Sequence, residues 1–87
     1  MNEIKINRPN IEQLKRIGKL VAKEITETTG ADVEVTFTKN VLVYTEDLGQ
    51  EKSIIDLMKL AGRELLEISR YDAEEGLPAG ATFSFTY

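Results

Sequence analysis

The side chains that could do chemistry in this chain are few. Its 87 residues include neither histidine nor cysteine, which excludes a phosphohistidine, a histidine general base and a metal held by imidazole or thiolate. Carboxylates, hydroxyls, lysines and tyrosines remain, and each needs a neighbour that positions it or tunes its pKa. The sequence shows no glycine-rich phosphate loop, no nucleophile elbow and no aspartate set spaced for calcium. We therefore expect no catalytic residue, no cofactor and no metal.

Charged residues are numerous, and they indicate solvated surface. The net charge of -4 argues against nucleic-acid binding, which draws its affinity from Lys and Arg at phosphates. The acidic loop around Asp72 and Glu74 is typical of a solvated loop rather than a cation site. Basic residues gather on one expected helix, where acidic residues are interleaved with them: Lys15, Arg16, Lys19 and Lys23 beside Glu12, Glu24 and Glu27.

Ser53 is the most informative polar residue. It precedes an apolar helical run and has Asp56 three residues later, so we expect its hydroxyl to cap that helix. A phosphate at this place would bring about 1.5 to 2 negative charges to the positive end of the helix without unfolding it. Ser53 is therefore a candidate for regulatory phosphorylation.

The elements that position these residues follow from hydrophobic periodicity. Alternation predicts strands, and apolar residues three or four apart predict helices. The first helix carries an apolar stripe of Ile11, Leu14, Ile17, Val21 and Ile25, with Gly18 in it and Gly30 as its stop. The expected strands span residues 3–6, 33–37, 41–44 and 81–87, and the expected helices span residues 11–29 and 53–69.

The resulting order, βαββαβ, predicts an α+β fold in one domain of residues 1–87. The economical architecture is a two-layer open-faced sandwich, in which two helices cover one face of a four-stranded, mainly antiparallel sheet. On the last strand, Phe83 and Phe85 should point to the helices, while Thr82 and Ser84 face outward.

The second expected helix is apolar on two sides. Beside its core stripe lies a strip that something should cover, either a protein partner or a second copy of the chain. With Ile54, whose role as a contact comes from the family resemblance below, the partner-binding candidates are Ile54, Ile55, Met58, Gly62 and Leu66.

Two segments resemble the HPr family of phosphotransferase-system phosphocarriers, and a third, residues 76–85, is more weakly similar to the family's entry to its last strand. Ala31-Asp32-Val33-Glu34-Val35 is similar to the family's second strand, and Lys52-Ser53-Ile54-Ile55-Asp56-Leu57-Met58-Lys59-Leu60-Ala61 resembles the signature around its regulatory serine. The histidine of the family motif is missing, since Ile6-Asn7-Arg8-Pro9 keeps only the Arg-Pro. We also expect no counterpart of the family's third helix.

The resemblance implies a non-catalytic regulatory or adaptor protein that binds a protein partner and is controlled at Ser53. It also implies that Ile54, Ile55 and Met58 contact that partner. In the HPr arrangement the first strand pairs with the last at one edge of the sheet.

Two other functions fit the same element order. One is a ferredoxin-like binding or oligomerisation module, whose first strand lies inside the sheet. The other is an acylphosphatase-like hydrolase, in which Arg8 would hold phosphate and Asn40 would position water. The glycines of that family's phosphate loop are missing here.

The start of the sequence shows no secretory signal, and no apolar run is long enough to span a bilayer. With the absence of cysteine, these features predict a cytoplasmic protein that contacts neither membrane nor nucleic acid.

Overall fold

A computed structural model describes residues 11–87 of the chain. Helix α1 spans Ile11–Thr29 and ends where the sequence predicts, because Gly30 adopts a φ of 80° and its N–H donates to the Thr26 carbonyl at 2.9 Å. No helix in this part of the chain is long and apolar enough to cross a membrane. The predicted strand over residues 3–6 lies outside the described residues.

A hairpin follows α1, as its alternating residues predict. Strand β1, Val33–Phe37, pairs antiparallel with β2, Val41–Thr45, and Val35 stands opposite Val43. The Thr38 N–H donates to the Asn40 carbonyl at 2.8 Å and closes the turn between the strands. A short 3-10 helix, η1 at Leu48–Gln50, then leads into α2 at Glu51–Leu60.

The predicted extension of the second helix through Ser69 is wrong. Helix α2 ends at Leu60, because Gly62 takes a left-handed φ of 83° and the Arg63 N–H bonds back to the Met58 carbonyl at 3.0 Å. Strand β3, Leu65–Tyr71, begins directly afterwards and pairs with β4, Gly80–Phe85.

A β-bulge explains why β3 resembles a helix in the sequence. The register shifts between Leu65 and Glu67, so that Leu65 stands opposite Phe85 and Ile68 opposite Phe83. The bulge therefore puts Leu65 and Ile68 on the same face although they are three residues apart, a spacing that otherwise indicates a helix.

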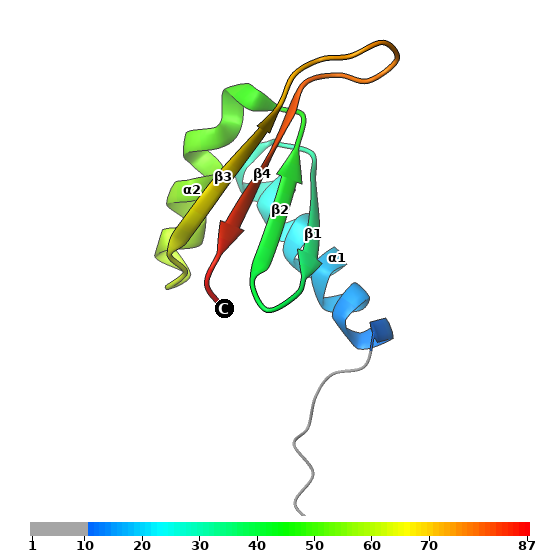
Figure 1. Cartoon of the computed structure of the whole chain (residues 1–87). Helices are drawn as coiled ribbons and strands as arrows, with labels where there is room; N and C mark the ends of the chain where they lie inside the picture. Colours follow the sequence, from blue (N-terminus) through cyan, green and yellow to red (C-terminus); the bar gives the residue numbers. More distant parts are fainter. Residues whose placement is uncertain (1–10) are drawn as a thin grey trace, which may run out of the picture.

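The architecture is the predicted α+β two-layer sandwich with an open face. The four strands run in the order β1-β2-β4-β3, all antiparallel, and both helices lie on one side of the sheet (Figure 1). Within residues 11–87 the elements follow the order αββαββ. The strand that the sequence did not predict is β3, most of which lies in the stretch expected to be helical.

The core lies between the sheet and the helices. Phe83 and Phe85 of β4 are fully buried there, as their alternation predicts. Of the two residues expected to face outward, Thr82 is half-buried, but Ser84 is buried. Its buried apolar residues come from both layers: Ile25, Ala31, Val41, Val43, Ile54, Met58, Ala81, Phe83 and Phe85. Because β4 lies inside the sheet and supplies three of these residues, the core centres on it.

Helix α1 crosses β1 at very close range. Gly18 is buried, and a Cβ atom added to it would lie only 2.7 Å from the carbonyl oxygen of Val35. Val21 is half-buried and Ile25 fully buried along the same stripe, whereas Ile11 and Ile17, also expected in the stripe, are exposed. The buried part of the stripe thus runs C-terminally from Gly18, with Leu14 half-buried ahead of it.

Gly18→Ala should destabilise the protein, although the same change in an exposed helix stabilises it. The added methyl group would push α1 away from the rigid Val35 carbonyl, at a cost of about 1 to 3 kcal/mol. Gly49→Ala is the matched control, since a Cβ there meets nothing within 4 Å. Urea unfolding of both variants measures the difference, and an unchanged Gly18→Ala midpoint would contradict the close contact.

Candidate functional site

Ser53 lies in the first turn of α2, and its side chain is exposed to solvent. Because η1 runs directly into α2, the helix begins upstream of Ser53 and its N-cap is Gln50. The Gln50 side chain makes no capping bond. The prediction that Ser53 caps the helix is therefore wrong. Accessibility, which phosphorylation requires, is nevertheless present at this residue.

Ser53→Ala should leave stability unchanged or raise it by a few tenths of a kcal/mol. Without a cap to lose, the change only replaces serine by the better helix former, whose advantage is about 0.5 kcal/mol. Thermal or urea unfolding checks this value. A loss near 1 kcal/mol, typical of a removed cap, would show that the hydroxyl does cap α2 in solution.

The strip expected on the second helix does not exist as a surface. Ile54 is fully buried and Met58 is only 3% exposed, so both belong to the core beneath α2. Ile55 is half-buried, and Gly62 forms the turn after the helix. Leu66 is 52% exposed but lies at the bulge of β3. A partner site made of these five residues is not supported, because the helix ends at Leu60 and turns Ile54 and Met58 inward.

Met58→Glu should unfold the protein or cost at least about 3 kcal/mol, because it buries an unpaired carboxylate in the core. Leu60→Glu, two residues later on the same helix, is the control: Leu60 is 87% exposed, and surface changes usually stay within about 0.5 kcal/mol. Circular dichroism during urea titration compares them. Equal stability of the two variants would show that Met58 is not packed as described.

The two phosphate-site candidates are not brought together within the described residues. Arg8 lies outside them. Asn40 is half-buried in the turn between β1 and β2, where its N–H donates to the Thr38 hydroxyl at 3.2 Å. Its carbonyl accepts the Thr38 N–H, so the backbone of Asn40 serves to close the hairpin.

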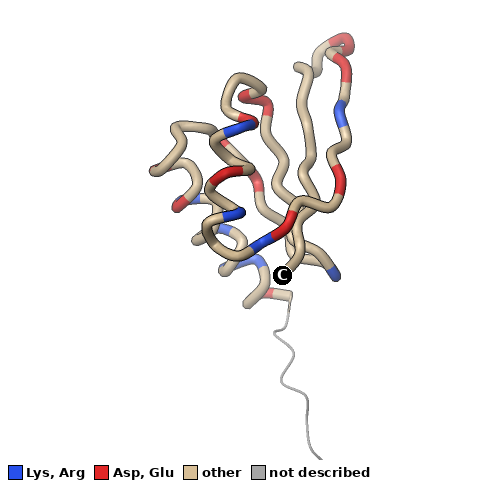
Figure 2. The backbone as a smooth tube through the Cα atoms, turned by 90° about the vertical axis from the view of Figure 1, so that its left-hand side faces the viewer, with Lys and Arg blue, Asp and Glu red and all other residues tan. Residues whose placement is uncertain are grey.

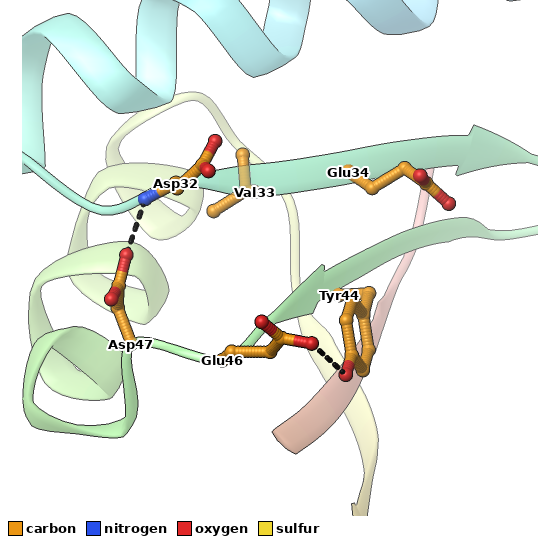
Figure 3. Close-up of a pocket in the computed structure, with 6 residues that line it drawn as sticks. All are labelled: Asp32, Val33, Glu34, Tyr44, Glu46 and Asp47. Carbon is orange, nitrogen blue, oxygen red and sulfur yellow. Dashed lines mark hydrogen bonds between the residues drawn. The ribbon is translucent and has the colours of Figure 1, made fainter. Parts of the chain in front are cut away.

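A shallow acidic pocket lies at the end of the sheet where β1 begins and β2 ends. Figure 3 shows its six lining residues: Asp32, Val33, Glu34, Tyr44, Glu46 and Asp47. The Asp47 carboxylate accepts the Asp32 N–H at 2.6 Å, and the Tyr44 hydroxyl donates to Glu46 at 3.1 Å. Desolvation, together with this hydrogen bond, raises the pKa of Tyr44 above its ordinary value, so the phenol stays neutral. Among residues 11–87, no three carboxylates are placed to hold a metal ion.

Tyr44 also belongs to an aromatic pair on the open face. Its ring centroid lies 6.3 Å from that of Tyr71, whose hydroxyl donates to Thr82 at 3.2 Å. A Cβ added at Gly80 would meet the Tyr44 ring at 2.8 to 2.9 Å. The ring thus covers the glycine backbone of β4, which gives Tyr44 a structural role.

A second, more apolar groove lies between α1 and β1. One side of it is made by four consecutive β1 residues, Glu34, Val35, Thr36 and Phe37, and the other side by Ile11, Leu14, Lys15 and Lys19 of α1. Consecutive residues of a strand face opposite sides of the sheet. A groove lined by all four therefore runs along the outer edge of β1.

Among residues 11–87, no strand pairs with the edge of β1 along this groove. β1 is the outermost strand and pairs only with β2 among the strands of residues 11–87. Figure 1 shows the dark-blue beginning of α1 projecting outward past β1. Ile11, at this projecting end, is 71% exposed, an unusual degree for an isoleucine of the expected core stripe.

Sequence reasoning missed this groove because it assigned Ile11 and Leu14 to the core. Their spacing matches the stripe, but only the crossing of α1 over β1 decides how much of the stripe lies over the sheet. One signal was present: Lys15 and Lys19 border the stripe at helical spacing on one flank. In Figure 2 the charged residues of the described chain are spread over helices, loops and strands, and basic residues recur along α1.

No protein-family model matches the chain, and no curated protein or solved structure matches it. The resemblance to the HPr family thus stands on the similar sequence segments alone. In the described sheet, β4 lies between β2 and β3, so β3 occupies the place beside the last strand that the HPr arrangement gives to the first strand.

Proposed function

We propose that this chain is a non-catalytic protein-binding module of regulatory or adaptor type, and that its docking surface is the groove between α1 and β1. One observation carries the proposal. Apolar side chains from the helix and the strand line a groove that follows the outer edge of β1, with which no other strand of residues 11–87 pairs. Proteins commonly protect such an edge with charges, bulges or a covering segment unless a partner uses it.

The exposure of the groove residues supports a binding role. Ile11 is 71% exposed to water. Burying one isoleucine side chain contributes about 1.5 to 3 kcal/mol. Leu14 and Phe37 are half-buried beside it and can be covered further. These exposed and half-buried side chains of α1 and β1 support a partner surface at the groove.

Control by Ser53 remains part of the proposal in a changed form. The residue is exposed on α2, which lies toward the β3 side of the molecule in Figure 1, away from β1. Charge at Ser53 cannot act through Ile54 and Met58 as a binding surface, because both are buried. A phosphate there would instead alter the exposed first turn of α2, where Lys52 pairs with Asp56 at 3.0 Å.

Selection from a phage-displayed library of random peptides on the full chain tests the docking function. Ile11→Glu should weaken the selected peptides at least about tenfold, the equivalent of 1.4 kcal/mol, because it charges the groove. Leu20→Glu is the matched control, since Leu20 is 63% exposed on the same helix and does not line the groove. Calorimetric titration gives the affinities. Failure to select any peptide, or equal loss in both variants, would contradict the proposal.

A further inference from the structure

We propose that the groove receives an extended acidic segment of another protein, which adds to β1 as a fifth strand. The inference rests on the proposed docking function and specifies the partner: its conformation, its alternation and its charge. Three features of the described residues lead to it: the outer edge of β1, the projecting start of α1 and the lysines of the groove. The same lysines also argue against a second copy of the chain as the partner.

The backbone of β1 offers hydrogen bonds to an added strand. In an antiparallel pair, bonded and non-bonded positions alternate. Because the Thr38 N–H bonds to the Asn40 carbonyl, the alternation assigns Thr36 and Glu34 to bonded pairs with β2. The N–H groups of Val35 and Phe37 then face the outer edge, and an extended segment can accept them. The Val35 carbonyl faces the same edge but packs against the α1 backbone at Gly18, so we expect the segment to leave that carbonyl out of the pairing.

The overhang of α1 provides the apolar contact for such a strand. The projecting helix end leaves Ile11 exposed and Leu14 half-buried at the groove. Every second side chain of a strand beside β1 would point to the α1 side of the sheet. These side chains would cover Ile11 and Leu14, so the segment should be apolar at alternate positions.

The charges of the groove predict which residue types occupy the remaining positions of the segment that point toward α1. Lys15 and Lys19 line the wall that α1 contributes, and the described residues give neither an ion pair. Acidic side chains next to the apolar ones would meet these ammonium groups. Glu34 points to the open face, so outward positions of the segment should be neutral.

The same lysines argue against a second copy as the occupant. Pairing two β1 edges around a twofold axis would bring the Lys15 and Lys19 flanks of both α1 helices toward each other. Like charges facing across an interface suppress that pairing. Lys15 and Lys19 attract the carboxylates of an acidic segment from a different protein, whereas they repel the same lysines of a second copy.

A short synthetic peptide tests the inference on the full chain. It alternates threonine with glutamate, valine, isoleucine and glutamate, a pattern nearly the same in both directions, so that parallel and antiparallel addition are both allowed. One counterpart replaces the glutamates with lysines. Two further peptides keep every side chain but carry N-methyl groups on alternate residues, one peptide on the odd-numbered residues and the other on the even-numbered ones. Each of them lacks the backbone N–H donors on one edge of the added strand.

The glutamate peptide should bind at least about tenfold more tightly than the lysine peptide, and its advantage should shrink as salt is added. Methylation of the donors that face β1 should abolish binding. Lys15→Glu with Lys19→Glu should reverse the preference, whereas Lys52→Glu with Lys59→Glu on α2 changes the net charge equally and should leave it. Hydrogen exchange at Val35 and Phe37 should slow when the glutamate peptide is bound.

The outcomes separate this inference from the docking function. Library peptides that need Ile11 but tolerate N-methylation and charge reversal would overturn the fifth strand and leave the docking function standing. If no peptide of any kind binds, both fail. A dimer in sedimentation that Ile11→Glu dissociates, or slow exchange at Val35 and Phe37 in the peptide-free chain, would show that the edge is already occupied and would overturn the inference.

Discussion

The close approach of α1 to β1 at Gly18 is the constraint on which the rest of the structure depends. With hydrogen in place of a side chain, the helix backbone comes within van der Waals contact of the Val35 carbonyl. This contact sets the crossing of the helix over the edge strand. The turns after Gly18 then place Val21 and Ile25 against the sheet, while the turns before it project past β1. The core and the groove are therefore two consequences of one crossing.

The last strand organises the other half of the molecule. β4 pairs with β2 on one side and β3 on the other, and it supplies Ala81, Phe83 and Phe85 to the core. Because Met58 and Ile54 of α2 belong to this core, the apolar face of the short second helix is buried within the protein. No continuous strip of it is left for a partner, although Leu60 at its end is 87% exposed, and Ile11 at the projecting end of α1 is 71% exposed.

The electrostatics of the two sheet ends differ. Carboxylates gather around Tyr44 where β1 begins, and two of them, Glu46 and Asp47, already accept hydrogen bonds from local donors. The groove along the rest of β1 instead has two lysines of α1 on one side and a backbone edge that no other strand of the described residues pairs with. Local hydrogen bonds account for the acidic pocket, whereas the groove has binding capacity that the described residues do not use.

The sequence by itself determined the α+β class, the first helix with its glycine stop, the β1–β2 hairpin and the inward side of β4. Each of these follows from a local period that neighbouring residues share, and such periods persist whatever the rest of the chain does. It did not determine the end of α2 or the existence of β3, because a bulge gives Leu65 and Ile68 the three-residue spacing of a helix. It also misplaced Ser53 as a cap and Met58 as a surface residue, since both depend on where η1 joins α2 and on which face meets β4. Only the tertiary structure decided which part of the α1 stripe is core and which part is groove, because the same apolar spacing serves either purpose until the crossing at Gly18 is fixed.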